Sequence, residues 1–319
     1  MVTKKILIFG ATGQIGRYCI RRLVKNNYKV IAVTRNSHKA VFLKTQAPIG
    51  YLEIEQASIF DEKRINDLLS GVDVCINLIG ILFEKGKKNT FEEIHSNFPE
   101  NLSKICKNKN IDLIHISALS LNAAKDSKYA QSKIKGEKKI RENLPEATII
   151  KPSVIHSVDD NFSTKLFSLL RLLPLFPIYY NGETKFSPIH ASEIAELIFF
   201  VISKRILSKD IEAIGPEVLS FKEIIEILLK SINKKRLLLP LPLPLAKILA
   251  YFFQLLPNPL LTIDQLRLLK YDNVKSDKGT TNFDIGCPSK ILFEESIKSY
   301  SYNWKDGGKY SIRKTDKFK

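Results

Sequence analysis

A glycine-rich turn near the start of the chain restricts the possible folds more than any other feature. Gly10, Gly13 and Gly16 have the spacing GxxGxxG, directly after the apolar residues 6–9 and directly before a helical pattern of apolar residues. Strand, tight turn and helix in this order form the phosphate-binding unit of dinucleotide-binding folds. The helix N-terminus there presents unpaired N–H groups and the positive end of the helix dipole. The sequence therefore predicts a dinucleotide cofactor at residues 10–16.

Strand and helix patterns alternate through the first half of the chain. We expect strands at residues 5–9, 29–34, 51–55, 72–79, 111–116 and 147–150. We expect helices between them at residues 14–25, 61–70, 90–107 and 129–142, and Thr90 with Glu93 predicts a capping box at the start of the third. Apolar strands that alternate with helices predict an α/β fold with a Rossmann-type doubly wound parallel sheet, covered on both faces. The predicted NADP-binding domain spans residues 1–152.

The pattern loosens after residue 152. Helices are expected at residues 163–172, 191–204 and 220–232, with prolines in the irregular segments between them. Ser220 and Glu223 predict a capping box at the start of the last helix. We expect a smaller, mainly helical lobe over residues 153–304, which binds a substrate or a partner and is interleaved with late strands of the sheet. The basic residues 305–319 are expected to form a flexible tail.

One segment of this lobe is unusually apolar. It begins at Leu237 and ends at Leu261, and its leucines alternate with prolines before a helical stretch that contains one lysine. The prolines predict an extended entry to this helix. Two interpretations remain open: a helix buried against the lobe, or a surface that docks on a membrane or a large partner.

The charge balance restricts the possible partners. The formal net charge is +17. This excess fits a solvated lysine-rich surface, an acidic protein partner or an anionic membrane face. The lysines are spread through every predicted helix without interleaved aromatic residues, which argues against a nucleic-acid partner.

The sequence also carries expectations about the compartment. Its four cysteines, Cys19, Cys75, Cys106 and Cys287, form no CxxC pair, which indicates thiols in a reducing compartment. The first predicted strand starts close to Met1, and no run of 18 apolar residues occurs. We therefore expect a bacterial cytoplasmic protein, peripheral on the inner face of the plasma membrane if its apolar segment docks there.

The end of the second predicted strand bears on the choice of cofactor. NAD sites place a carboxylate there to bind the ribose 2′-hydroxyl, but this strand ends at Thr34 and is followed by Arg35. A guanidinium can hold a 2′-phosphate through two parallel hydrogen bonds. The sequence therefore favours NADPH over NADH; the alternative is that Arg35 is a loop cation and the site is unselective.

Tyr129 and Lys133 form a candidate catalytic pair. They stand four residues apart, on one face of a predicted helix. A nearby ammonium can lower the pKa of a phenol, which can then relay a proton during hydride transfer. The alternative is a surface pair that arose by chance.

Together with Asn77-Leu78-Ile79-Gly80 and Lys151-Pro152-Ser153, these motifs resemble the short-chain dehydrogenase/reductase superfamily, in its atypical or extended branch. Residues 76–80, 144–153 and 239–244 further resemble the NADPH-binding alpha-subcomplex accessory subunits of respiratory complex I and their alphaproteobacterial relatives. This likeness extends over residues 4–300. It includes the proline–leucine segment, which ordinary reductases lack.

The resemblance implies both a site and a role. The implied cofactor site consists of Gly10, Thr12, Gly13, Gln14, Ile15, Gly16, Arg35, Ser58, Ile59, Leu78, Ile79, Gly80, Tyr129, Lys133 and Pro152. The implied catalytic group is Tyr129 and Lys133 with Ser117. The role implied is an NADPH held as a structural or regulatory ligand, with complex I subunits as partners. The alternative is an active NADPH-dependent reductase or epimerase, with a ubiquinone-related substrate.

The chain departs from the pattern of active reductases. Leu119 takes the position of the catalytic serine, while Ser117 stands at the strand end, and Ser120 can serve only if the loop bends differently. Ser58 replaces the usual adenine-contacting aspartate. The resemblance places His190 near the cleft between the lobes, and the alternative is a core or loop histidine. The five histidines have no metal-ligand spacing, so we expect no metal site.

Overall fold

The computed structural model describes residues 4–256 and 259–308. Its centre is an eight-stranded sheet in which every pairing is parallel, and the strand order is β14-β11-β6-β5-β4-β1-β2-β3. The strands are β1 (Lys5–Phe9), β2 (Lys29–Thr34), β3 (Leu52–Gln56), β4 (Val74–Asn77), β5 (Asp112–Ile116), β6 (Thr148–Pro152), β11 (Asp210–Ala213) and β14 (Thr280–Thr281). The predicted fold class is confirmed, and two strands of the sheet come from the C-terminal half.

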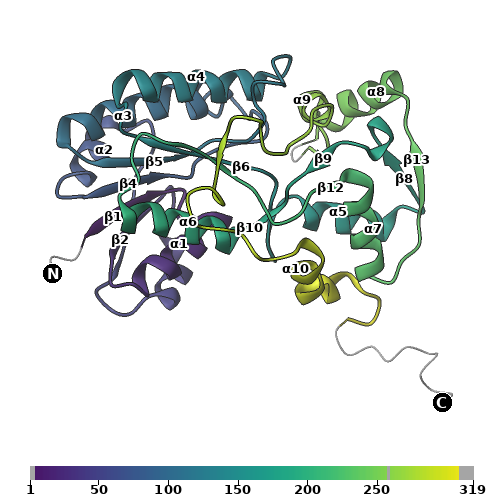
Figure 1. The fold of residues 1–319 in the computed structure, drawn as a ribbon, viewed down its shortest axis with the longest axis horizontal. Helices are drawn as coiled ribbons and strands as arrows, with labels where there is room; N and C mark the ends of the chain where they lie inside the picture. Colours follow the sequence, from purple (N-terminus) through teal and green to yellow (C-terminus); the bar gives the residue numbers. More distant parts are fainter. Residues whose placement is uncertain (1–3, 257–258, 309–319) are drawn as a thin grey trace.

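Helices cover both faces of this sheet (Figure 1). One face packs on α1 (Gln14–Val24) and α6 (Ala191–Lys204). The other packs on α2 (Glu62–Leu68), α3 (Phe98–Lys109) and α4 (Lys128–Asn143). The strands are apolar on both sides because both faces are buried. The 3₁₀ segment η1 (His38–Gln46) connects β2 to β3.

Two predicted elements differ from the structure. The strand expected at residues 72–79 is shorter, because the side chain of Asn77 accepts the N–H of Ile79 and turns the chain out of the sheet. The helix expected at residues 90–107 begins with a π-helical segment, η2 (Glu92–Asn97), before α3. Thr90 accepts the N–H of Glu93, but the Glu93 carboxylate bonds Asn97 instead of returning, so the predicted capping box is incomplete.

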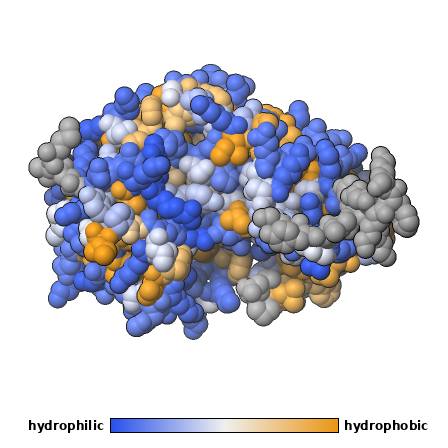
Figure 2. Space-filling model, turned by 90° about the horizontal axis from the view of Figure 1, so that it is seen from below, coloured by the Kyte–Doolittle hydropathy of each residue, from blue (hydrophilic) through white to orange (hydrophobic). Residues whose placement is uncertain are grey.

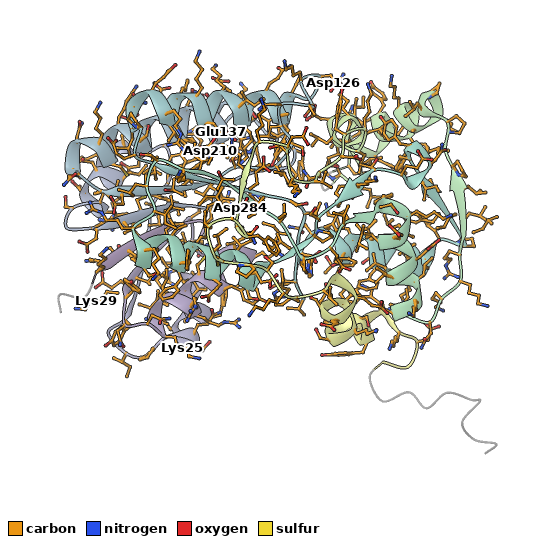
Figure 3. All side chains as sticks on the ribbon, in the orientation of Figure 1. Lys25, Lys29, Asp126, Glu137, Asp210 and Asp284 are labelled. Carbon is orange, nitrogen blue, oxygen red and sulfur yellow. The ribbon has the colours of Figure 1, made fainter. Side chains whose placement is uncertain are left out.

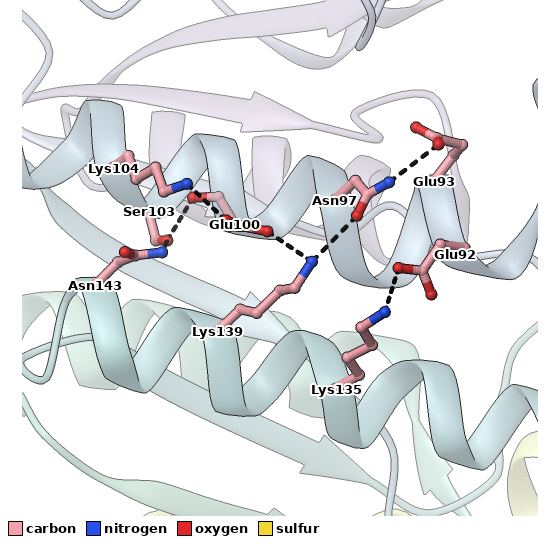
Figure 4. Close-up of polar contacts among 9 residues, drawn as sticks. All are labelled: Glu92, Glu93, Asn97, Glu100, Ser103, Lys104, Lys135, Lys139 and Asn143. Carbon is pink, nitrogen blue, oxygen red and sulfur yellow. Dashed lines mark hydrogen bonds and ion pairs between the residues drawn. The ribbon is translucent and has the colours of Figure 1, made fainter.

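The η2–α3 rod lies against α4 through a row of polar contacts (Figure 4). Lys139 joins Glu100 at 2.6 Å and Asn97 at 3.1 Å, and Lys135 pairs with Glu92 at 2.5 Å. Next to Lys135 in α4, Gly136 lies against the backbone of η2: a Cβ on Gly136 would overlap the carbonyl oxygen of His95. The two helices therefore meet at backbone contact, which requires a glycine at this position.

The C-terminal lobe has a core of its own. It is formed by α5 (Ser163–Leu172), α7 (Phe221–Ser231), α10 (Phe293–Tyr300) and η4 (Ser301–Trp304), with the parallel pair β8 (Leu175–Ile178) and β13 (Leu237–Pro240). A capping box at Ser220 and Glu223 opens α7, as the sequence predicts. The remaining elements are β7 (Ile155–His156), β9 (Lys185–Phe186), β10 (Ile189–His190), β12 (Leu219–Ser220) and the 3₁₀ turn η3 (Tyr180–Gly182).

The apolar segment forms β13 and then α8 (Leu243–Phe253), which packs on α9 (Ile263–Leu268). Only small residues of α8 are buried, Ala246 and Ala250 at 0% exposure, whereas Phe252 is 60% exposed. The interpretation of a buried helix is therefore wrong. Residues 257–258 of this segment, and residues 309–319 of the expected tail, lie outside the described residues. Within the described residues, no helix is long and apolar enough to cross a membrane.

The contact at Gly136 gives the first testable prediction. In an exposed helix position, Gly→Ala stabilises by up to about 1 kcal/mol. Here we expect Gly136→Ala to lower the free energy of unfolding by about 3 kcal/mol, because the methyl group forces α4 away from η2. Urea denaturation of both proteins measures this difference. Lys138→Ala, on the exposed side of the same helix, serves as the control, and an unchanged or higher stability of Gly136→Ala would contradict the backbone contact.

Candidate functional site

The predicted cofactor residues gather at the carboxyl ends of the parallel strands. The chain runs from β1 to β2 and β3 on one side of the sheet, and then to β4, β5 and β6 on the other. The carboxyl ends of β1 and β4 are therefore the switch point at which open α/β sheets bind ligands. The turn at residues 10–16 follows β1, and residues 78–80 follow β4. Arg35 follows β2, and Ser58 and Ile59 follow β3, farther along the same edge.

The glycine turn brings α1 close to the sheet. Gly10 has a φ of 81°, a conformation that favours glycine, and its carbonyl accepts the N–H of Gly13 at 3.0 Å. A Cβ on Gly10 would lie 3.2 Å from the Cβ of Leu78, and one on Gly16 would meet the carbonyls of Gly10 and Ala11. Larger residues at Gly10 and Gly16 would push α1 away from β1 and β4.

The N-terminus of α1 is suited to an anion. Gly13 is its N-cap and supplies no side-chain cap, and its first turn contains no acidic residue. The first N–H groups of a helix have no partner within the helix, and the helix dipole is positive at this end. The backbone at Gln14 and Ile15 could therefore hold the diphosphate of a dinucleotide. When bound, the reduced dinucleotide would supply a hydride.

Side chains of the loop after β7 fix this helix end. The Gln14 amide donates to Ser157 Oγ at 2.9 Å, and Arg17 pairs with Asp159. The adjacent Asp160 is buried and accepts the N–H groups of Ser157 and Phe162 at 3.0 and 2.8 Å. Sequence reasoning did not identify this loop. Its Asp-Asp pair shortly after β7 is a usable signal, because short acidic loops bind backbone N–H groups.

The wall after β4 depends on Asn77. Its side-chain oxygen accepts the N–H of Ile79 at 3.0 Å, and its amide group donates to His115 Nδ1 at 3.1 Å. Burial lowers the pKa of His115 well below its ordinary value, so this histidine is neutral and structural. The turn brings Gly80 beside Lys133: a Cβ on Gly80 would lie 3.4 Å from Lys133 Nζ. The predicted residues Gly80 and Lys133 are therefore adjacent.

Tyr129 stands in the first turn of α4. Ser127 caps this helix, and Asp264 of α9 accepts the N–H groups of Lys128 and Tyr129 at 2.8 and 3.0 Å. Burial and the charge of Glu137 raise the pKa of Tyr129 to about 12. In the absence of a cofactor the phenol is therefore protonated at neutral pH. It can donate a proton there, but it is a poor base.

Lys133 is a buried cation, 4% exposed. Its Nζ donates to the carbonyl of Ile116 at 3.1 Å. Burial lowers its pKa to about 8, although Glu137 acts in the opposite direction. An ammonium held in this way can bind hydroxyl groups of a ribose and offset negative charge near the phenol.

His95 belongs to this site, although its sequence position indicated no role. Its Nε2 accepts the N–H of Ile81 at 3.0 Å, so the proton of the neutral ring is on Nδ1, which donates to Ser132 Oγ at 2.9 Å. Ser132 in turn donates to the carbonyl of Tyr129 at 2.7 Å. Burial and the nearby Lys133 lower the pKa of His95 to about 2, so the ring is neutral.

This histidine connects the two walls of the site. Its ring lies edge-on to Tyr129, with centroids 5.2 Å apart, and bonds the loop that contains Gly80. It stands in η2, and π-helical turns inside helices often occur at functional sites. His95 therefore positions Tyr129 relative to the loop after β4.

Ser117, the predicted third catalytic residue, is buried, and its hydroxyl donates to Glu137. Glu137 also pairs with Lys151 at 2.8 Å, and Lys151 pairs with Asp210 at the same distance. Figure 3 shows Glu137 and Asp210 together beneath α4. Burial alone would lower the pKa of Lys151, but the two carboxylates raise it. The Ser117 hydroxyl is thus part of a structural charge network between α4, β6 and β11.

The resemblance places Leu119 at the position of the catalytic serine, and this assignment stays a prediction. Leu119 is 4% exposed and is held by its backbone: its N–H donates to the carbonyl of Pro152 at 2.9 Å, and its carbonyl accepts from Asn273. Ser120 has a φ of 59° and donates to the carbonyl of Val274 at 3.4 Å. Both neighbouring serine hydroxyls are therefore engaged by protein groups.

The remaining predicted residues have simple environments. Arg35 and Ser58 are exposed, and Ser58 Oγ accepts the N–H of Phe60 at 3.3 Å. His190 caps α6 by accepting the N–H of Ser192, which supports the alternative of a structural histidine. Residues 4–256 and 259–308 contain no group of three His, Cys, Asp or Glu side chains that could hold a metal ion.

Comparisons with known proteins agree with this geometry. The profile of the NmrA-like family matches residues 2–94. The chain is 27% identical to the mitochondrial NADH dehydrogenase (ubiquinone) 1 alpha subcomplex subunit 9 of Arabidopsis thaliana, over 89% of this chain and 74% of the relative. It is 25% identical to the mitochondrial NADH-ubiquinone oxidoreductase 40 kDa subunit of Neurospora crassa, over 92% of this chain and 80% of the relative.

A solved structure shares the fold. The dTDP-glucose 4,6-dehydratase of Bacillus anthracis in complex with NAD superposes with a TM-score of 0.69 at 14% identity, over 95% of this chain and 96% of that chain. The predicted resemblance is therefore confirmed: the chain is homologous to the alpha subcomplex subunit 9 of complex I, and it shares its fold with this dehydratase.

The buried ammonium predicts a pH-dependent stability. A folded pKa of about 8, below the ordinary 10.5, means that the folded protein binds this proton less tightly than the unfolded chain does. The resulting destabilisation is complete below about pH 8 and fades as pH rises to 10.5. We expect Lys133→Met to raise the free energy of unfolding by about 2 kcal/mol at pH 7. This net value includes the smaller loss from removing the hydrogen bond of Lys133.

Urea unfolding between pH 7 and pH 10.5 measures this effect, with the exposed Lys138→Met as the control. The gain of Lys133→Met should shrink with rising pH, while the control shows no such trend. If the free energy of unfolding of Lys133→Met differed from that of the native protein by the same amount at every pH, the burial of a charged amine would be contradicted.

Proposed function

We propose that this chain binds NADP(H) as a protein of the short-chain dehydrogenase/reductase type and retains it as a structural or regulatory ligand. The observation that carries this proposal is a contrast within one site. The turn at Gly10, the helix end at Gln14 and the buried Lys133 fit a dinucleotide. In this proposal the buried Leu119 takes the position where a reductase needs a hydroxyl. A substrate carbonyl would find no donor at that position.

The adenosine end of the site supports NADP(H). β2 ends at Thr34 without a carboxylate, and the exposed Arg35 follows it directly. Among the described residues, Arg35 forms no ion pair, so its guanidinium is available to a 2′-phosphate. Ser58 and Ile59 follow the neighbouring β3 and would border the adenine.

The relatives suggest a role within a larger assembly. Both are named as subunits of NADH:ubiquinone oxidoreductase, and this chain covers 74% and 80% of their lengths. We propose that the chain is an accessory subunit of that type, at the inner face of a bacterial plasma membrane. The exposed surface of α8 would supply contact area beyond the cofactor site.

An active reductase or epimerase is the second candidate. It is favoured by one observation: Tyr129 and Lys133 are both present at the site, and the lysine is buried. In that case Tyr129 would donate the proton to the reduced carbonyl oxygen, and Lys133 would hold the ribose. Ubiquinone-related compounds are the substrates to test first.

One experiment separates the two candidates. The protein is purified without added nucleotide, and the small molecules released on denaturation are identified by mass spectrometry. Retained NADPH is then followed by its fluorescence after addition of quinones, sugar nucleotides or simple carbonyls. We expect near-stoichiometric NADPH and no oxidation. Oxidation that Tyr129→Phe abolishes would establish the reductase instead, and a protein free of dinucleotide that does not bind added NADPH would contradict both.

Cofactor selectivity gives a separate prediction. Arg35→Asp replaces an attraction to the 2′-phosphate by a repulsion, so we expect it to weaken NADPH binding at least about tenfold while NADH binding changes about twofold or less. Fluorescence titration measures both dissociation constants. Lys44→Asp, the same charge reversal at an exposed residue of η1, controls for the loss of positive charge. An equal loss for both cofactors in Arg35→Asp would remove the argument for NADP(H).

A further inference from the structure

The far end of the C-terminal lobe exposes large apolar side chains. Of 22 exposed large apolar residues in the described chain, 13 lie in two segments, residues 161–182 and 227–263. They are Leu172, Leu173, Leu175, Leu237, Leu239, Leu243, Leu245, Ile248, Tyr251, Phe252, Leu255, Leu256 and Leu260. We name these 13 residues the leucine surface. Figure 2 shows apolar patches on an otherwise mostly hydrophilic face, including the side of this lobe.

Backbone geometry brings the two segments together. β8 and β13 pair in parallel with Leu175 beside Leu237, so Leu175, Leu237 and Leu239 stand on the same side of the pair. Their exposed fractions are 50%, 58% and 42%. The chain continues through Pro242, the N-cap of α8, into that helix. The β8–β13 pair and α8 therefore contribute to one region of the lobe (Figure 1).

The helix α8 exposes its large apolar side chains, whereas most helices on a protein surface bury them. Its inner side is formed by Ala246 and Ala250, which pack on Leu266 of α9. Its outer side carries Ile248, Tyr251 and Phe252, which are 54%, 54% and 60% exposed. A surface helix normally buries its large apolar residues and exposes polar ones. In α8 the small residues pack against the lobe, and the large apolar side chains are exposed and can contact a membrane or a partner.

The charges of the same segments have one sign. Residues 161–182 and 227–263 contain no Asp or Glu. They contain seven cations: Lys165, Arg171, Lys230, Lys234, Lys235, Arg236 and Lys247. Two of these cations form ion pairs with carboxylates outside the segments, Lys230 with Glu294 at 3.1 Å and Lys234 with Asp306. The region that carries the leucine surface is thus apolar and mainly cationic, and Glu226, next to the second segment, lines the same pocket as Lys230 and Lys234.

We propose that the leucine surface inserts into the headgroup region of an anionic lipid bilayer, with α8 lying in the membrane plane. A bilayer face offers an apolar layer beneath a sheet of negative charge, which matches both properties of the region. The 11 residues of α8 are too few to span a bilayer. An acidic protein partner would also attract these cations, so the experiment below includes a protein partner as a result that would overturn the proposal. This inference rests on the docking role proposed above, but not on cofactor binding.

Vesicle sedimentation of the full chain tests the proposal. The probes are vesicles of phosphatidylcholine alone and vesicles in which about a third of the lipid is phosphatidylglycerol. We expect the protein to bind the anionic vesicles about tenfold more tightly than the neutral ones, and rising salt to weaken this binding. NADPH retention is measured on the same samples, so that loss of cofactor and loss of lipid binding are scored separately.

Matched variants locate the contact. Phe252→Asp on α8 should reduce binding to anionic vesicles about tenfold, whereas Phe42→Asp, at a similarly exposed phenylalanine of the first lobe, should not. Lys247→Glu on α8 should likewise reduce binding to anionic vesicles, whereas Lys107→Glu on α3 should not. Fluorescence of Trp304, the one tryptophan of the chain, confirms that each variant is folded.

Three results would overturn the inference. The native protein can fail to sediment with anionic vesicles, the control variants can lose binding as much as the α8 variants, or the protein can bind a membrane only when that membrane contains a respiratory complex. The last result would assign the leucine surface to a protein partner. If NADPH is retained in any of these cases, the proposed cofactor role stands without the bilayer contact.

Discussion

The structure depends on the close approach of the α1 N-terminus to the ends of β1 and β4. Gly10 takes a left-handed backbone conformation, and Gly16 packs against the carbonyls of the turn. This contact places the positive end of a helix dipole at the sheet's switch point. The Gln14–Ser157 and Arg17–Asp159 contacts then connect the same helix end to the loop after β7. Both lobes therefore meet at the position proposed for the diphosphate.

The opposite wall of the crevice is held from within α4. His95 bonds the loop after β4 and, through Ser132, the backbone of Tyr129. Asp264 bonds the first N–H groups of the same helix from α9. Since α9 also packs on α8, the exposed apolar helix is connected through α9 to the first turn of α4, which contains Tyr129. A bilayer bound at α8 would thus be connected to the proposed cofactor site.

Sequence reasoning predicted the parts of this protein that local patterns determine. The GxxGxxG turn, the apolar strands and the capping box at Ser220 each depend on nearby residues, and each is found in the structure. The π-helical η2 was missed because its apolar spacing does not distinguish it from an α-helix, and its contact with Gly136 involves a distant helix. The sequence left α8 ambiguous, since an apolar run does not reveal which side is buried. The alanine spacing at Ala246 and Ala250 was the signal that could have settled it.

The roles of individual site residues are harder to infer than their positions. Ser117 lies at the strand end as the sequence predicts, but its hydroxyl is directed to Glu137 by charges on β6 and β11. Such a network is assembled from four elements and has no local pattern. A crystal structure of the protein with NADPH measures the central claim most directly. The account predicts the diphosphate at the backbone of residues 13–15 and the 2′-phosphate at Arg35; a dinucleotide bound elsewhere, or a crevice closed by side chains, would contradict it.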